Sequence, residues 1–164
     1  MPESPTEKLR AWIGDMRVAM FTTIGADGTL HTRPMATQEP TSIDELWFFT
    51  SRHNLLTDEI DHLPRVGLSY ADASRRRYVA VSGSAKLIRD EAKTRELWNP
   101  WIGAWFPGGP GDPDLRLIRV TAERAEYWDA SAHRMALLFE TAKTALGGQS
   151  HLPPTEHAAV DFPH

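Results

Sequence analysis

The chain has 164 residues, no cysteine and a formal net charge of −4 at pH 7. These values exclude disulfides and thiolate chemistry and argue against a basic nucleic-acid-binding face. No run approaches the roughly 18 consecutive apolar residues of a membrane span, and residues 1–4 lack the basic and apolar regions of a signal peptide. We therefore expect a cytoplasmic protein whose partners include neither nucleic acid nor a membrane. The length suits one domain over 1–164, with a core at 7–148 and a polar, proline-rich tail at 149–164 that wraps the surface or is mobile.

A helix is predicted near the N-terminus. Ser4 or Thr6 can cap its first turn, and Pro5 suits the first helical position. Apolar residues then recur at helical spacing, so that one face of the helix would cover an end of a sheet: Leu9, Trp12, Ile13 and Met16.

The next segment predicts a β-hairpin and a third strand. Apolar, β-rich runs occupy 18–24 and 46–50, and another strand lies between them at 30–38. Asp27-Gly28 favours a tight turn, because glycine adopts positive φ readily. Pro34 cannot donate to a ladder, which places it at an edge, a bulge or a strand start. Arg33 then lies beside backbone groups that the interrupted ladder leaves without a partner, and a ligand could bind to these groups and to the arginine.

The middle of the chain alternates short helices and strands. Asn54 is predicted to cap a helix at 55–62 whose apolar stripe ends before Pro64; the stripe consists of Leu55, Leu56, Glu59, Ile60 and Leu63. Strands follow at 65–70 and 78–88, and Gly83 indicates a bulge or bend in the second.

In the last third, Asp90 is predicted to cap a helix that runs through Trp98. Residues 107–113 hold three glycines and three prolines, so no regular element fits them, and we expect a mobile flap over a ligand site. A strand at 115–121 is continued or followed by 125–128, and a final helix at 133–146 ends at two glycines. Antiparallel strands with helices at their connections predict a small barrel of α+β class.

Catalytic motifs are scarce, so we expect the chemistry to come from a cofactor. No two of the seven histidines have the i, i+4 spacing of a helical metal site, so no metal is expected. There is no Gly-x-Ser-x-Gly and no glycine-rich phosphate loop. Spacing does not rule out a Ser-His-Asp triad, but nothing in the sequence indicates one.

Three features suit a flat, anionic cofactor. Arg33 can pair with a phosphate, although a surface salt bridge is the commoner role of a lone arginine. Residues 50–54 end a strand and begin a helix. The amide and hydroxyl groups there can bind an anion, or they can serve only to cap the helix. The aromatic residues before the glycine-rich loop can wall an isoalloxazine ring or pack in a core, and packing is favoured for Trp98 but not for Trp105.

The order of these motifs resembles the general stress protein 26 group of the pyridoxamine 5′-phosphate oxidase-like, FMN-binding split-barrel superfamily. The resemblance rests on 18–35, 46–50, 78–85, 97–113 and 126–129, and it covers nearly the whole chain. It implies a mainly β, α+β fold: a six-stranded antiparallel split β-barrel with peripheral helices. It also implies a homodimer with FMN at the dimer interface. The cofactor-binding residues that it implies are Arg33, Pro34, Met35, Ala36, Phe49, Thr50, Ser51, Asn54, Trp101, Trp105 and Phe106, the last three either from near the site in the same chain or from the other subunit.

One departure from the family pattern bears on the phosphate. The family usually has a lysine where this chain has Leu56, and the oxidases have an arginine where it has Leu55. We therefore expect Arg33 to be the main remaining cation for an FMN phosphate, with Arg52 or His53 as alternatives. The C-terminal arginine and histidine that hold substrate in the oxidases have no match, so pyridoxamine 5′-phosphate oxidase activity is not expected.

The resemblance favours a general stress protein-like flavoprotein that acts as an FMN-dependent oxidoreductase. In such a protein the flavin carries the electron transfer and the chain supplies binding and electrostatics. Two alternatives remain open. One is a non-catalytic module that sequesters a flavin, and the other is a structural dimer with weak or lost FMN affinity.

Overall fold

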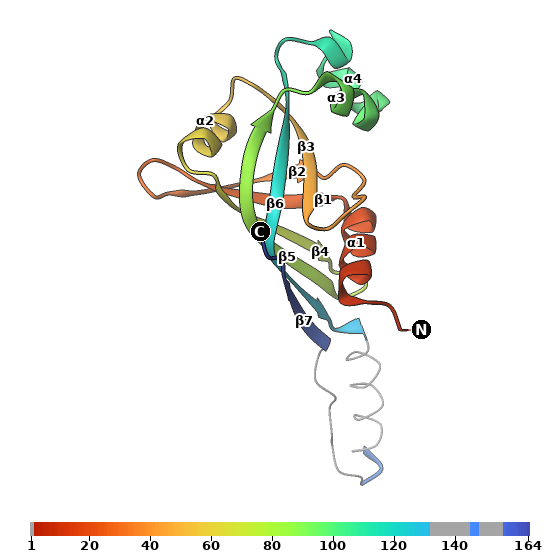
Figure 1. Cartoon of the computed structure of the whole chain (residues 1–164). Helices are drawn as coiled ribbons and strands as arrows, with labels where there is room; N and C mark the ends of the chain where they lie inside the picture. Colours follow the sequence, from red (N-terminus) through yellow and green to blue (C-terminus); the bar gives the residue numbers. More distant parts are fainter. Residues whose placement is uncertain (1, 132–144, 148–155) are drawn as a thin grey trace.

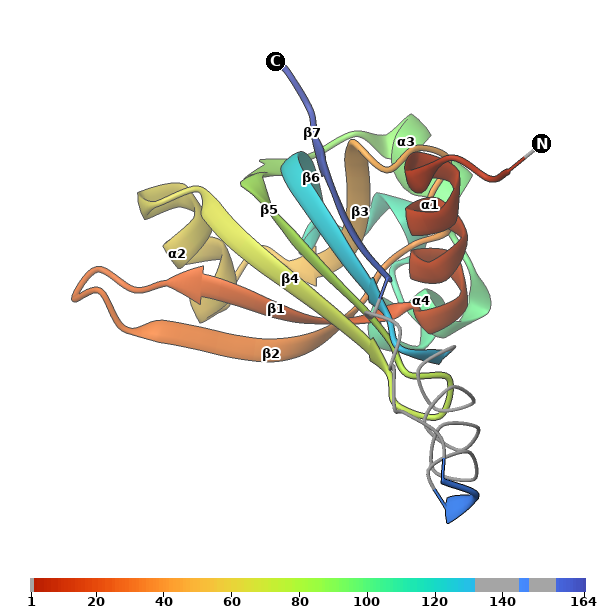
Figure 2. The ribbon, with the colours of Figure 1, turned by 90° about the horizontal axis from the view of Figure 1, so that it is seen from below.

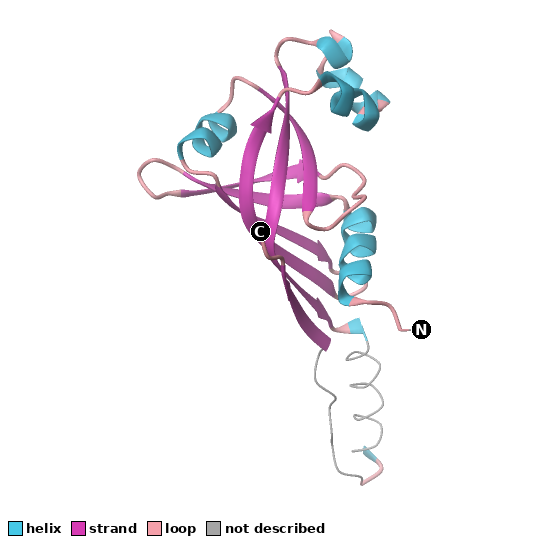
Figure 3. Cartoon of the chain, viewed as in Figure 1, coloured by secondary structure: helices cyan, strands magenta, loops and turns pink. Residues whose placement is uncertain are grey.

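The computed structural model describes residues 2–131, 145–147 and 156–164. Within these residues the chain forms one seven-stranded antiparallel sheet with four α-helices and a short 3-10 turn around it (Figure 1). Figure 3 shows the helices at the periphery of the strands. The strand order is β2-β1-β4-β5-β6-β3, with β7 also paired to β6. Because β2 and β3 end this order without pairing, the sheet curves but does not close, which confirms the predicted α+β split barrel.

The predicted hairpin is present as β1 (Val18–Ile24) and β2 (Leu30–Ala36). Its turn uses Gly28 at φ 84°, in the region that only glycine adopts without strain. Pro34 lies opposite Met20, and its missing N–H faces no further strand because β2 is an edge of the sheet. Of the three positions expected for the proline, an edge, a bulge or a strand start, the structure shows the edge.

The third strand and the helix after it also match the prediction. β3 spans Glu45–Ser51 and α2 spans Leu55–His62, with the Asn54 side chain accepting from the Thr57 amide. The apolar stripe expected on α2 was wrong at one position. Leu56 and Ile60 are buried, whereas Leu55 is 59% exposed.

Two long strands form the centre of the sheet. β4 (Arg65–Asp72) pairs with β5 (Arg77–Ile88), and β5 pairs along most of β6 (Leu115–Asp129). The second run expected at 125–128 is thus the continuation of one strand. The ladder register shifts between Ser82 and Gly83, which confirms the predicted bulge. The bulge lets the first half of β6 pair with β3 while the second half pairs with β7.

The seventh strand comes from the segment expected to be a tail. β7 (Glu156–Asp161) pairs with β6, and alternate side chains at Ala158, Val160 and Phe162 pack against the core. This alternation is that of a half-buried strand, so the count of six strands and the description of 149–164 as a tail were incomplete. Most of the helix expected at 133–146 lies outside the described residues.

The remaining helices cover the ends of the barrel. α1 (Pro5–Met16) is capped by Ser4 and buries Leu9, Trp12 and Ile13; Figure 2 shows α1 and α2 on opposite sides of the sheet. α3 (Glu91–Leu97) is capped by Asp90, and α4 (Pro100–Trp105) follows it. Among the described residues, no helix is both long enough and apolar enough to cross a membrane.

Candidate functional site

The opening between the two unpaired edges of the sheet holds a cavity of about 750 Å³. Residues of β2 and β3 line its walls, and the segment from α4 to the start of β6 lines the rest. Its lining residues are Pro34, Met35, Ala36, Gln38, Phe49, Thr50, Ser51, Asn54, Ile102, Trp105, Phe106, Pro107, Asp112 and Asp114.

Apolar groups form one part of this cavity. Ile102, Trp105 and Phe106 project from α4 and its C-cap, because Asn99 caps the helix and Pro100 fixes its first turn. Trp105 is 80% exposed, so its indole ring is not packed in the hydrophobic core. Phe49 lies between the cavity and Trp98, whose ring meets it edge-on at 6.2 Å. The Phe49 contact agrees with the packing role favoured for Trp98.

Polar groups gather where β3 ends and α2 begins. The Asn54 amide donates to Thr50 Oγ1 at 2.9 Å, and Asn54 Oδ1 accepts from the Thr57 N–H at 2.9 Å. The capping role of Asn54 is therefore filled, while its side chain and those of Thr50 and Ser51 still border the cavity. Asp112 and Asp114 add carboxylates to the lining.

The structure brings nine of the eleven residues of the predicted site around this one cavity. Arg33 and Trp101 do not line it. Trp101 lies on α4 one turn from Trp105 and is 82% exposed.

Arg33 points to the inside of the β1–β2 hairpin rather than into the cavity. Its Nη1 donates to Thr23 Oγ1 at 2.6 Å and to the His31 carbonyl at 3.1 Å, and its Nη2 lies 3.8 Å from Glu59 Oε2. Glu59 is only 4% exposed, and it also accepts hydrogen bonds from Thr23 and from His31 Nδ1, the latter at 2.6 Å. This network uses the charge of Arg33 to compensate a buried carboxylate.

Glu59 remains ionised inside this network. Burial raises the pKa of its carboxyl, but hydrogen bonds from Thr23 and His31 and the charges of His31 and Arg33 outweigh burial, so the pKa lies below the ordinary 4.5. The network thus joins the strand that carries Pro34 to Ala36 with the helix that starts at Asn54. Its place on the apolar stripe of α2 was the sequence signal that Glu59 is buried.

The loop at 107–113 borders the cavity through Pro107 and Asp112. The expectation that no regular element fits it was wrong for Gly109–Gly111, which form a 3-10 turn. Asp112 Oδ2 accepts from the Gly108 N–H at 3.2 Å, and the Asp112 N–H donates to the Gly109 carbonyl at 3.0 Å. The mobility of this loop stays a prediction.

Five lining residues were missing from the prediction: Gln38, Ile102, Pro107, Asp112 and Asp114. The pair Asn99-Pro100 was a usable signal for Ile102, because an Asn cap followed by proline starts a helix and places the residues after it. Pro107 and Asp112 lie in the loop that was expected over a ligand site. Nothing local marks Gln38. Its N–H donates to the Trp47 carbonyl at 2.9 Å, and this contact exists only once β2 and β3 approach each other.

An open antiparallel barrel with a ligand-sized cavity at its split defines the split-barrel class of proteins. A sequence profile described as pyridoxamine 5′-phosphate oxidase like matches residues 4–151. The chain belongs to this family.

Individual relatives agree with the assignment. A general stress FMN/FAD binding protein from Xanthomonas citri is 34% identical, with a TM-score of 0.67 over 76% of this chain and 87% of that one. A candidate general stress protein 26 from Jannaschia sp. CCS1 is 25% identical, with a TM-score of 0.75 over 94% and 96% of the two chains. Protein bli-3 of Neurospora crassa is 27% identical over 86% of this chain and 72% of that protein.

Proposed function

We propose that this chain binds a flavin, FMN, in the cavity between β2 and β3 and acts as an FMN-dependent oxidoreductase. The observation that carries the proposal is the split character of the cavity. Its lining combines the aromatic side chains of Phe49, Trp105 and Phe106 with the polar groups of Thr50, Ser51 and Asn54. A ring system with a polar tail matches this division, and the Xanthomonas citri relative is described as binding FMN or FAD.

The residues of this chain fit the ring of such a cofactor. Phe49, Trp105 and Phe106 offer π-faces, and Pro34 to Ala36 line the cavity from the edge strand β2. Thr50, Ser51, Asn54 and Gln38 supply hydroxyl and amide groups that orient a bound molecule. A bound flavin supplies hydride and electron transfer at its ring, and the chain binds it and excludes water.

Trp105→Ala is expected to weaken FMN binding by about five- to 150-fold. This range corresponds to the roughly 1–3 kcal/mol that a flat base gains by stacking on an aromatic side chain. Quenching of flavin fluorescence measures the dissociation constant. Trp101→Ala is the matched comparison, because both tryptophans are exposed on the same helix and only Trp105 lines the cavity.

Four results of this titration are informative. A loss confined to Trp105→Ala supports the cavity as the flavin site, and a loss in both variants places Trp101 of a second subunit there as well. Unchanged binding in both would contradict the site. Absence of flavin binding in the parent would leave the structural-dimer alternative, and turnover of a reduced nicotinamide by the holoprotein separates the enzyme from a non-catalytic flavin carrier.

We also propose a homodimer that covers the outer face of the β1–β2 hairpin. Val18 pairs with Ala36 and Met20 pairs with Pro34, so these four side chains share one face. Val18 is 50% and Met20 45% exposed. This apolar patch continues into the cavity through Pro34 and Ala36. A second subunit would cover the patch and complete the cavity wall.

Light scattering of the parent is expected to give twice the 18.4 kDa mass of one chain. Met20→Glu is expected to shift the protein to monomer while it stays folded, because the new charge lies on an exposed face. Tyr78→Glu is the control, since Tyr78 is a similarly exposed apolar residue outside the patch. A monomeric parent at micromolar concentration would refute the dimer.

A further inference from the structure

Three arginines converge at the end of the barrel where β3, β5 and β6 meet. Arg116 on β6 is the ladder partner of Thr50, Arg52 follows β3 directly, and Arg89 follows β5. The β3 end is held against β6, because the Arg52 N–H donates to the Asp114 carbonyl at 2.8 Å. The three side chains therefore come from three adjacent strand ends.

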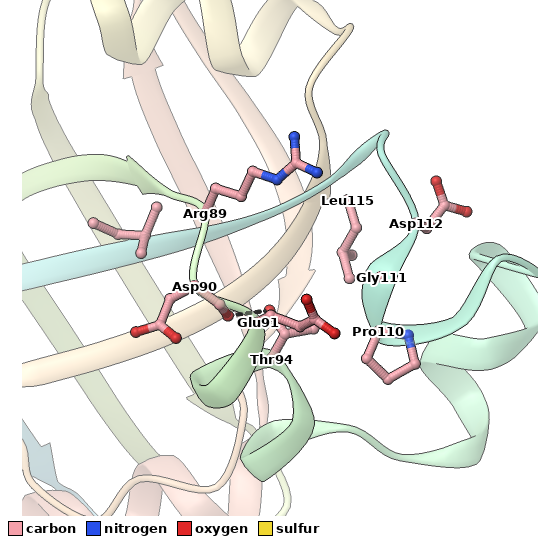
Figure 4. Close-up of a pocket in the computed structure, with 9 residues that line it drawn as sticks. Arg89, Asp90, Glu91, Thr94, Pro110, Gly111, Asp112 and Leu115 are labelled. Atoms are coloured by element: carbon pink, nitrogen blue, oxygen red, sulfur yellow. Dashed lines mark hydrogen bonds between the residues drawn. The ribbon is translucent and has the colours of Figure 1, made fainter.

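In the part of the chain that the structure describes, a carboxylate pairs with one of the three arginines. Arg52 Nε lies 3.6 Å from Asp114 Oδ1, and both side chains are largely exposed. In the described part of the chain, Arg89 and Arg116 form no ion pair with a carboxylate. Arg116 Nη1 donates only to the carbonyls of Pro113, at 3.0 Å, and Leu115, at 2.8 Å. Figure 4 shows the Arg89 side chain extending away from the carboxylates of Asp90 and Glu91.

The charges of the cluster act on one another. Desolvation lowers the pKa of Arg116, and the nearby charges of Arg89 and Arg52 lower it further, while Asp114 opposes them. Cations that lie close together repel one another, and a bound anion reduces this repulsion.

The cluster also adjoins the polar end of the cavity. Ser51 and Asn54, on either side of Arg52, line the cavity, as does Thr50, the ladder partner of Arg116. Asp114, the ion-pair partner of Arg52, lines it too. No cationic side chain lines the cavity itself among the described residues, Arg33 is held by Glu59, and Leu56 is buried.

We infer that Arg52, Arg89 and Arg116 form an anion site that takes the phosphate monoester of a flavin whose ring lies in the cavity. This inference rests on the proposed function and names the residues that hold the charged end of the ligand. Planar guanidinium groups suit phosphate oxygens, because each can donate two parallel hydrogen bonds. The site replaces the cations that Leu55 and Leu56 do not provide.

The test compares FMN with riboflavin, which lacks the phosphate. The parent is expected to bind FMN about tenfold to a hundredfold more tightly than riboflavin, because this factor corresponds to the free energy of one hydrogen bond to a charged group. In Arg52→Gln/Arg89→Gln this preference is expected to disappear while riboflavin binds as in the parent. Arg95→Gln removes the same charge from an exposed arginine on α3 that pairs with Glu91, and it should keep the preference.

A stability measurement separates binding from a structural role. If the arginines repel one another, Arg89→Gln should leave the apo melting temperature unchanged or raise it, and a drop would indicate a structural role and count against the site. Inorganic phosphate should raise the melting temperature of the parent and not that of the double variant.

The outcomes distinguish this inference from the proposed function. Equal affinity of the parent for FMN and riboflavin, or an unchanged preference in the double variant, overturns the arginine site and leaves flavin binding intact. If neither flavin binds, the proposed function fails. The melting temperatures with inorganic phosphate then test the anion site without any flavin. An increase in the parent that is lost in the double variant supports the anion site. No increase in the parent overturns it.

Discussion

Glu59→Ala is expected to lower the free energy of unfolding by about 3 kcal/mol, because it removes the centre of a buried ionic network. Arg33, His31 and Thr23 would all lose a partner on the inside of the hairpin. Glu59→Gln keeps the shape and loses the charge, so a smaller loss of about 1–3 kcal/mol is expected. Urea denaturation of parent and variants measures both values.

Asp58→Asn is the matched control for this series. Asp58 is the exposed neighbour of Glu59 on the same helix, and its change should stay within about 0.5 kcal/mol. The network also joins Pro34–Ala36 to α2, so flavin affinity is expected to fall together with stability in Glu59→Ala. A Glu59→Ala protein as stable as Asp58→Asn would show that the network contributes no net stability.

The contribution of Glu59 depends on pH in a defined direction. The pKa of its carboxyl is lowered in the folded state, so the folded protein holds this proton less tightly than the unfolded chain does. Its stabilisation is therefore complete above the ordinary pKa of 4.5 and is lost as the pH falls through the lower folded value. The stability difference between parent and Glu59→Gln should shrink as the pH falls below about 4.5.

Gly83→Ala is expected to cost at least about 3 kcal/mol, because the bulge leaves no space for a side chain. A Cβ at this position would clash with the Thr121 carbonyl oxygen and lie 3.1 Å from the Ala122 Cα. Both are backbone atoms of β6, so no rotamer change relieves the clash and the β5–β6 ladder must move. Thermal and urea unfolding measure the loss.

Gly67→Ala provides the comparison for this prediction. Gly67 lies on β4 opposite Ser82, one residue from the bulge, and a Cβ there meets no atom within 4 Å. Its change should be close to neutral or slightly stabilising, since alanine loses less backbone entropy than glycine. If Gly83→Ala were as mild as Gly67→Ala, the close approach of β5 and β6 at the bulge would not constrain the fold.

Local chemistry made much of the fold predictable. Ser4, Asn54 and Asp90 cap their helices where the sequence indicated, because a cap acts within one helical turn. Gly28 and Pro34 marked the turn and the edge strand for the same reason: each restricts its own backbone. The order of motifs also led to the split-barrel family.

Elements with weak local signals were missed. α4 begins at Asn99-Pro100 but is only six residues long. β7 shows alternation over a few residues beside prolines, and it is stable as a strand because β6 offers an unpaired edge and an apolar surface. A single segment does not reveal that such a partner exists.

The sequence by itself therefore determined the split barrel, its helix caps and nine residues that gather at one cavity. Only the tertiary structure decided how the charges are distributed. Arg33 is separated from Glu59 by 26 positions, yet hairpin and helix bring them together and neutralise the cation expected to hold a phosphate. Arg52, Arg89 and Arg116 meet because three strand ends converge. Charge pairing depends on distance in space, and sheet register sets that distance.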